Sequence, residues 1–262
     1  MGIAEQFQAA LNASGQTYER RMVRNGLTLA TVTNITDPDK LNRVKCLPIE
    51  NDQNREETDW CYVMAPLGGR ECGQFFFPNV NDLVVLAYLG GDPHRPMVIG
   101  SWWNTEVKPP YVIDQGKVYN YTVKTPGGTE LLFYDEPGKQ KVTLTLPSGT
   151  VLKIDDENKA VALQDKSGDN ALTMDLNGGA VELKAKTKLV LSAGKTTITL
   201  ESSGNITQKA GAKVAIEGAN IEEKGSAGVK VEGATVDVKA NATLNLQASG
   251  PATLKGAIVN IN

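Results

Sequence analysis

The C-terminal half of the sequence carries a short repeat that leaves few folds open. Pairs of apolar residues separated by one residue recur at steps of seven to nine residues, with Gly, Asn, Ser and Lys between them. The pairs are Val181/Leu183, Leu189/Leu191, Ile198/Leu200, Val214/Ile216, Val229/Val231, Val236/Val238, Leu244/Leu246 and Val259/Ile261. Two others, Ile206/Gln208 and Ile221/Glu223, keep the spacing but have a polar second member. Alternation with period two predicts short β-strands with one buried face, each followed by a turn.

The composition of this half predicts a core too thin for a single chain. From Glu136 to Asn262 the sequence has no Phe, Trp, Tyr, His, Cys or Arg. Strands of about three to five residues bury too little apolar surface to stand alone in water. We therefore expect three chains to wind around one axis, each adding a strand to one face before turning to the next. At ~4.8 Å per strand, this intertwined trimeric (triple-stranded) β-helix needle would be roughly 70 Å long, and its strand edges would be paired.

Other uses of the repeat fit less well. A calcium-binding β-roll needs Gly-Gly-x-Gly-x-Asp repeats, and this half has only isolated residues such as Asp165 and Asp169. A carbohydrate-cleaving β-helix needs aromatic platforms beside clustered acids. The nearest acid cluster, Asp155-Asp156-Glu157, precedes Asn158, so we interpret it as a solvated turn and not as a catalytic pair.

The segment from Leu27 to Asn104 predicts a small all-β domain. Its apolar stretches are separated by turn residues such as Asp37-Pro38-Asp39 and Gly90-Gly91. Strands are expected at Leu27–Ile35, Arg43–Pro48, Trp60–Ala65, Gly73–Phe77, Leu83–Leu89 and Met97–Trp102. Such a set indicates a Greek-key barrel, and the OB fold is the commonest barrel of this size. The aromatic residues Phe75, Phe76, Phe77, Trp102 and Trp103 are expected in the barrel core or in contacts between subunits, not on a base-stacking platform.

Charge, hydropathy and rare residues exclude several classes of function. A net charge of -3 argues against a nucleic-acid binder, and no apolar stretch is long enough to span a bilayer. Cys46, Cys61 and Cys72 are expected to be reduced thiols, and His94 a surface residue without a second metal ligand nearby. The start of the chain lacks the pattern of a signal peptide. It predicts instead a short amphipathic helix with Ile3, Phe7 and Leu11 on one face.

Three pieces of the barrel segment resemble the baseplate assembly protein V family of contractile phage tails. Asp37-Pro38 followed by Arg43-Val44-Lys45 is similar to the opening of that family's domain. The stretches 77–85 (FPNVNDLVV) and 90–101 (GGDPHRPMVIGS) resemble its later strands, in the same order. The family usually has Gly where this chain has Asn42 and Asn81, and Asn is among the residues that tolerate left-handed backbone angles.

The resemblance extends beyond the barrel to the valine-glycine repeat (VgrG) spikes of type VI secretion. Residues 125–135 (TPGGTELLFYD) and 149–155 (GTVLKID) are similar to the neck of those spikes. The resemblance implies an all-β chain: a helical arm at 1–24, an OB-fold domain at 25–105, a neck at 106–140 and the trimeric β-helix spike at 141–262. It implies a structural spike of a phage, tailocin or related particle, made in the bacterial cytoplasm and assembled into a baseplate.

The departures from this family suggest which partners the chain needs. The ring-forming domain that precedes the OB fold in VgrG spikes is absent before residue 25, so a separate baseplate hub protein is expected to dock on Ile3, Phe7 and Leu11. The final residues, Val259, Asn260, Ile261 and Asn262, are expected to bind a tip protein of the Pro-Ala-Ala-Arg repeat (PAAR) type. Contact with the target membrane is expected to be transient.

The sequence predicts no enzyme. No catalytic, cofactor-binding or metal-binding residue is assigned, and no lysozyme domain is inserted between Trp103 and Pro126. A homotrimeric receptor-binding fibre or adhesin remains the alternative, although such fibres usually carry a globular head after the shaft.

Overall fold

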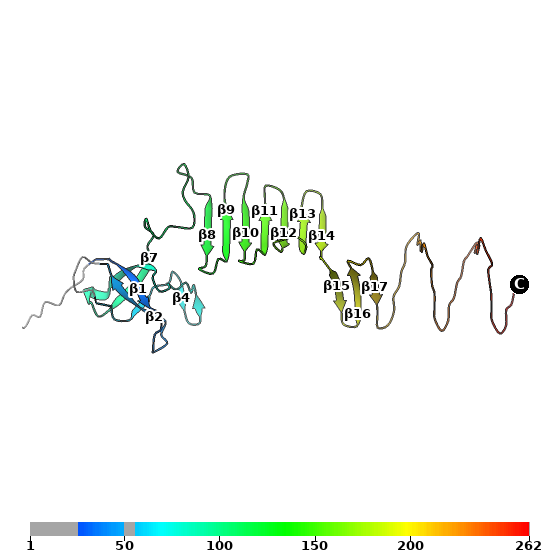
Figure 1. The fold of residues 1–262 in the computed structure, drawn as a ribbon, viewed down its shortest axis with the longest axis horizontal. Coiled ribbons are helices and arrows are strands. Elements are labelled where there is room, and N and C mark those ends of the chain that lie inside the picture. The colour runs from blue at the N-terminus through cyan, green and yellow to red at the C-terminus, as the bar shows by residue number, and fades with distance from the viewer. Residues whose placement is uncertain (1–25, 50–55, 262) are drawn as a thin grey trace, which may run out of the picture. The chain divides into compact units, whose positions relative to one another are not determined.

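The structure is a computed structural model that describes residues 26–49 and 56–261. The predicted N-terminal helix, with Ile3, Phe7 and Leu11, lies outside the described residues, as does Asn262. The chain divides into two compact units, with the division between Ala185 and Lys186. In the described residues, no helix is long and apolar enough to cross a membrane. The fold is almost entirely β, as the sequence predicts (Figure 1).

The first part of the chain is a closed barrel of five strands in the order β1-β2-β3-β7-β6. The strands are β1 (Thr28–Asn34), β2 (Arg43–Pro48), β3 (Cys61–Val63), β6 (Leu83–Tyr88) and β7 (Pro96–Ser101). Neighbouring strands are antiparallel except β3 and β7, which run parallel. A 3-10 turn, η1 (Leu89–Gly91), connects β6 to β7. This closed barrel confirms the predicted OB-like domain.

The barrel core consists of small and medium-sized side chains, because alternate residues of its strands point inward. Strand β2 shows the alternation clearly, with every second residue buried. The buried set is Ala30, Val32, Val44, Cys46, Cys61, Val84, Leu86 and Val98. Cys46 and Cys61 are buried free thiols and Cys72 is an exposed one.

The predicted strand at Gly73–Phe77 is wrong in most of its length. Only Cys72 and Gly73 are in a strand, β5 (Cys72–Gly73), which pairs with β4 (Gly68–Gly69). Gly73 has φ +145°, and the ladder ends there. Phe75 and Phe76 are exposed and only Phe77 packs against the core. By contrast, Asn42 and Asn81 have φ of 54° and 75°, as their substitution for Gly predicts.

Seven strands then form one antiparallel sheet in strict sequence order (Figure 1). They are β8 (Asn120–Lys124), β9 (Glu130–Tyr134), β10 (Lys141–Thr145), β11 (Val151–Asp155), β12 (Ala160–Gln164), β13 (Ala171–Asp175) and β14 (Ala180–Lys184). Strands β8 and β9, from the predicted neck, belong to the same sheet as the five that follow. Each strand is hydrogen-bonded only to strands of the same chain next to it in sequence.

The second unit begins with a smaller sheet and continues without one. Strands β15 (Lys188–Ala193), β16 (Thr196–Glu201) and β17 (Ile206–Lys209) pair in order. In the part of the chain that the structure describes, no β-ladder includes residues 210–261. Figure 1 shows this last segment running back and forth without arrows.

Turn geometry separates the paired strands from the unpaired segment. Most hairpin turns from β9 to β17 contain a left-handed residue, such as Gly149 (φ 88°) or Gly204 (φ 92°). Among the described residues, Gly204 is the last with positive φ. We expected each chain to give one strand to a face and then turn to the next face. In β8–β14 one chain instead supplies seven successive strands, because tight left-handed turns reverse its direction.

Candidate functional site

One face of the seven-stranded sheet is apolar along its whole length. The register pairs Val142 with both Phe133 and Ile154, and Leu144 with both Leu131 and Leu152. The same two-column pattern continues through every ladder of the sheet, since paired residues share a face. We call this set the apolar face: Tyr121, Val123, Leu131, Phe133, Val142, Leu144, Leu152, Ile154, Val161, Leu163, Leu172, Met174, Val181 and Leu183.

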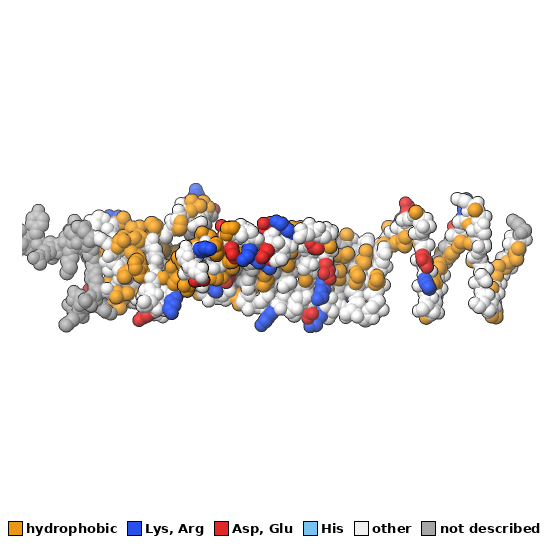
Figure 2. Space-filling model, turned by 90° about the horizontal axis from the view of Figure 1, so that it is seen from above, with side chains coloured by type: hydrophobic (Ala, Val, Ile, Leu, Met, Phe, Trp, Pro, Cys, Tyr) orange, Lys and Arg blue, Asp and Glu red, His pale blue; other side chains and the backbone are white. Residues whose placement is uncertain are grey.

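The apolar face is open in the single chain. Phe133 is 45% exposed, Ile154 49% and Val181 68%. Hydrophobic side chains lie open along the strands in Figure 2, beside Lys, Asp and Glu. A continuous exposed patch of this kind marks an interaction surface, because isolated soluble chains rarely leave one uncovered.

The opposite face of the sheet is mostly polar or small, with Leu132, Tyr134 and Val151 as exceptions. Thr143 pairs with Leu132 and Lys153, and Thr173 pairs with Ala162 and Glu182. Because the two faces differ in polarity, the apolar face of the sheet can contact a partner while the opposite face contacts water. The predicted strands with one apolar face are therefore present.

The smaller sheet of the second unit also carries apolar residues in columns on one side. Leu189 pairs with Leu200, and Leu191 with Ile198. Strand β17 adds Ile206 opposite Leu200 and Gln208 opposite Ile198. Beyond Lys209 the apolar pairs of the repeat are exposed, with Val231 at 68% and Leu246 at 87%. Figure 2 shows hydrophobic side chains open along this segment.

The turn after β11 holds a buried carboxylate. Asp155 Oδ2 lies 2.6 Å from Lys153 Nζ and 3.7 Å from Lys141 Nζ. Asn158 donates its backbone N–H to Oδ1 and its side-chain amide to Oδ2, both at 3.0 Å. The Lys153 ammonium, followed by the Asn158 amide, holds the pKa of Asp155 well below its usual range.

The prediction of a solvated acid turn is thus wrong for Asp155. Its side chain is 2% exposed, because two lysines and one asparagine enclose it. Asp156 remains exposed and pairs with Lys159, and Glu157 pairs with Lys141. The acids are each paired to a cation, an arrangement that stabilises a turn.

A second buried carboxylate organises the connection between β1 and β2. Asp37 accepts hydrogen bonds from the backbone N–H groups of Asp39, Leu41 and Arg43. It also binds the Arg43 side chain, whose guanidinium lies 5.8 Å from the centroid of the Trp60 ring. The Arg43 hydrogen bond holds the pKa of Asp37 well below its usual range. The sequence marked Asp37 and Arg43 only by resemblance, and this network gives the physical reason for both residues.

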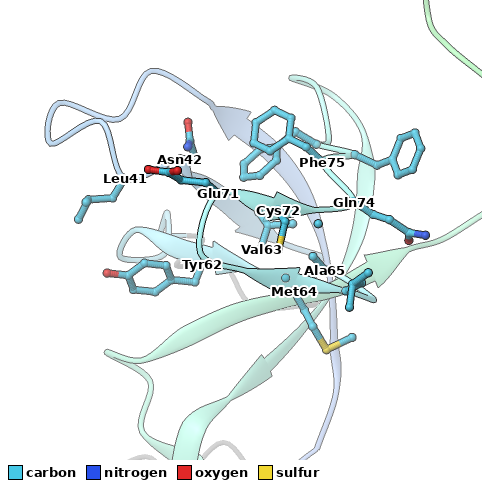
Figure 3. Close-up of a pocket in the computed structure, with 15 residues that line it drawn as sticks. Leu41, Asn42, Tyr62, Val63, Met64, Ala65, Glu71, Cys72, Gln74 and Phe75 are labelled. Carbon is cyan, nitrogen blue, oxygen red and sulfur yellow. The ribbon is translucent and has the colours of Figure 1, made fainter.

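The barrel surface has a groove beside the β4–β5 hairpin (Figure 3). Tyr62, Met64 and Cys72 line it, together with the phenylalanine run that ends at Phe77. Phe75 and Phe77 stack with ring centroids 4.9 Å apart. Phe75 and Phe76 are 71% and 65% exposed, and Trp102 and Trp103 are also exposed. The prediction that these four belong to the barrel core is wrong, and their use in subunit contacts stays a prediction.

Cysteine, acidic and histidine side chains are distributed over the described part of the chain. In those residues, no group of three or more His, Cys, Asp or Glu side chains is placed to hold a metal ion. His94 is exposed, and its Nδ1 lies 2.9 Å from Asp59 Oδ2. Of the predicted tip-binding residues, Val259 is 45% and Ile261 86% exposed. The tip-binding role of these residues stays a prediction.

Comparisons with known proteins point in the same direction as the fold. Residues 28–103 match the family described as the type VI secretion system/phage-baseplate injector OB domain. A stretch of 113 residues is 29% identical to the actin cross-linking toxin VgrG1 of Vibrio cholerae, covering 40% of this chain and 10% of that protein. Another of 88 residues is 32% identical to the type VI secretion system spike protein VgrG5 of Pseudomonas aeruginosa, covering 32% of this chain and 11% of that protein.

A third relative is the type VI secretion system spike protein VgrG3 of Vibrio cholerae, 26% identical over 98 residues, which cover 36% of this chain and 10% of that protein. The aligned stretches thus span about a tenth of the length of these relatives. The match to the injector OB domain coincides with the closed barrel β1–β7. The chain therefore contains a region, residues 28–103, that is similar to the injector OB domain of type VI secretion systems and phage baseplates, and its aligned stretches resemble VgrG spike proteins.

Proposed function

We propose that three copies of this chain form the central spike of a contractile, phage tail-like injection machine. The spike would join the baseplate hub to the tip and pierce the target envelope. The observation that carries the proposal is the apolar face, two side chains wide and open over seven strands. Burial of apolar area contributes about 25 cal/mol per Å², so such a face strongly favours association.

Three copies cover this face better than two. Three sheets with their apolar columns turned to a common axis form a closed prism, in which each sheet meets the other two. Two sheets stacked face to face leave open sides, along which water reaches a core only two residues wide. A three-fold assembly is also closed, so it does not continue into a fibre.

The unpaired segment 210–261 supports the same assembly. Backbone N–H and C=O groups need partners once they are buried, and no ladder within the described chain supplies them there. Two intertwined copies would supply them, and the exposed apolar pairs such as Val229/Val231 would fill the axis. Three copies of the seven-stranded sheet would close around their apolar faces, and the unpaired segments would close by winding around one another.

The proposed mechanism is mechanical. A prism with ladders on all faces resists bending, because bending must break backbone hydrogen bonds. Lysine, aspartate and glutamate side chains such as Lys153 and Glu182 would cover its outside. Several relatives are named spike proteins, which supports this use of the fold.

The partners are also proposals. A separate hub protein would dock on Ile3, Phe7 and Leu11, and a PAAR-like tip protein on the end formed by Val259 to Asn262. The exposed apolar side chain of Ile261 suits burial under a tip. The spike would be made in the bacterial cytoplasm, assembled into the particle, and meet the target membrane only during injection.

Single substitutions in this chain, introduced into the injection particle that contains it, test the proposal. Leu144→Glu places a charge on the apolar face, whereas Thr143→Glu places the same charge on the opposite face. We expect Leu144→Glu to abolish assembled baseplates in electron micrographs of purified particles, and Thr143→Glu to leave them intact. Normal, injection-competent particles carrying Leu144→Glu would contradict the proposed spike.

A further inference from the structure

One amide side chain interrupts the apolar columns. Gln208 lies directly opposite Ile198 in the β16–β17 ladder, beside Ile206, which lies opposite Leu200. Residues paired across a ladder share a face, so Gln208 belongs to the apolar side of its sheet. Among the apolar-column positions of the described strands β8–β17, Gln208 is the single one occupied by an amide or charged side chain inside a ladder. The other face of β17 is marked by Thr207, which pairs with Thr199.

The amide of Gln208 has no hydrogen-bond partner within the described part of the chain, where its residue is exposed. Burial of an amide without a partner costs about 1–3 kcal/mol. An apolar residue at this position would avoid that cost. The amide is therefore expected to meet a polar partner when the sheet face is covered.

Building on the proposed function, we propose that the three Gln208 side chains meet at the axis of the trimer and fix the register of the three chains. Each amide N–H donates to the amide oxygen of the next copy, so that all three are paired in a ring. A glutamine has both the donor and the acceptor that such a ring needs. The site is incomplete in one chain, because each copy supplies half of every hydrogen bond.

The position of Gln208 explains why a residue that fixes the alignment of the three chains is needed there. Strand β17 is the last strand of the described chain with an in-chain ladder. Beyond it, only partner chains would set the pairing, and successive apolar pairs such as Val229/Val231 and Val236/Val238 are chemically alike. A slip of one repeat would exchange similar pairs at little cost, except where it moves the charged Glu223 of the Ile221/Glu223 pair. When Gln208 is present, a shift of one chain by one repeat places the Gln208 amides beside apolar side chains, so that the amides lose their hydrogen-bond partners.

Substitutions in the full-length chain test this proposal. Gln208→Glu places three carboxylates around the axis, and Thr207→Glu is the control with the same charge on the opposite face. We expect Gln208→Glu to lower the midpoint of thermal unfolding at neutral pH by more than about 10 °C, and Thr207→Glu to shift it by less than about 2 °C. Light scattering on both variants reports whether they remain trimers.

A cross-linking measurement reads the register itself. Val214→Cys is introduced with Cys72→Ser, and the thiols are oxidised with diamide. In aligned chains the residues at 214 come together at the axis and form disulfide-linked dimers. We expect Gln208→Leu to raise the unfolding midpoint and to lower the yield of these dimers at least twofold, because slipped registers are then populated.

Two results would overturn the register role while the spike proposal stands: equal midpoints for Gln208→Glu and Thr207→Glu in a trimeric protein, or an unchanged dimer yield in Gln208→Leu. A monomeric wild-type chain would overturn both proposals together.

Discussion

Asp37 forms a bidentate ion pair with Arg43: Arg43 Nε donates to Oδ2 at 2.9 Å and Nη2 donates to Oδ1 at 2.8 Å. The Asp37 side chain is 3% exposed, whereas Asp39, which also pairs with Arg43, is 66% exposed. Bidentate pairs of this kind combine charge with fixed geometry. The pair ties the β1–β2 connection to strand β2 of the injector OB domain.

Asp37→Asn should destabilise the barrel far more than Asp39→Asn. The first substitution leaves Arg43 largely buried without its main counter-charge, while the second removes a solvent-screened partner. We expect the unfolding midpoint of the barrel to fall by roughly 5–10 °C for Asp37→Asn and by less than about 2 °C for Asp39→Asn. Near-ultraviolet circular dichroism follows the barrel through Trp60, against which Arg43 lies. Equal shifts for the two variants would contradict the buried role of Asp37.

Stability should fall in acid, with Asp37 and Asp155 as major contributors. Both have a pKa depressed in the folded chain, Asp37 by the Arg43 hydrogen bond and Asp155 by Lys153. A depressed carboxyl pKa stabilises the fold above the unfolded value of about 3.9, and this contribution is lost as pH falls toward the folded pKa. We expect a flat unfolding midpoint between about pH 5 and 7 and a steep decline below about pH 4. Asp155→Asn should reduce the slope of that decline, and an unchanged slope would count against the buried pair.

A glycine pair tests the hairpin turns. Gly149 and Gly138 have φ of 88° and 81°, so both resist an L side chain. A Cβ at Gly149 would lie 2.7 Å from Lys166 Cβ, whereas at Gly138 no atom lies within 4 Å. Each Gly→Ala change costs about 1–2 kcal/mol for the left-handed backbone, and only Gly149→Ala adds a clash. Gly149→Ala should therefore lower the unfolding midpoint more than Gly138→Ala, and the reverse order would show that the β10–β11 and β12–β13 turns do not pack as described.

The parts of the fold that follow local patterns could be predicted from the sequence. Period-two alternation identified β1, β2, β6 and β7 to within one or two residues at each end, and the apolar pairs identified the apolar side of strands β14 to β17. The run Phe75–Phe77 misled the prediction, because three aromatic residues in succession resemble a strand while the positive φ of Gly73 ends the ladder. Periodicity does not report such an angle.

Pairing partners were harder to infer than strands. An apolar pair such as Val181/Leu183 has the same pattern whether its strand pairs with a neighbour of the same chain or with a strand of another chain. The sequence pattern therefore did not predict that β8–β14 form one antiparallel sheet within the chain. The buried state of Asp155 was missed for a similar reason. Its enclosure depends partly on Lys141, which the β10–β11 pairing brings to Asp155 from the neighbouring strand. The prediction also placed Trp102 and Trp103 in the barrel core, but small and medium-sized side chains already fill that core and both tryptophans are exposed.

The mass of the purified full-length chain in solution, measured by light scattering, tests the central claim most directly. The apolar face and the unpaired segment 210–261 predict a single species of three times 28.1 kDa, which should persist on dilution if the chains are intertwined as proposed. Leu144→Glu should reduce this species and Thr143→Glu should retain it. A stable, soluble monomer of 28.1 kDa would contradict the account, since the open apolar columns from Tyr121 to Ile261 would then have no partner.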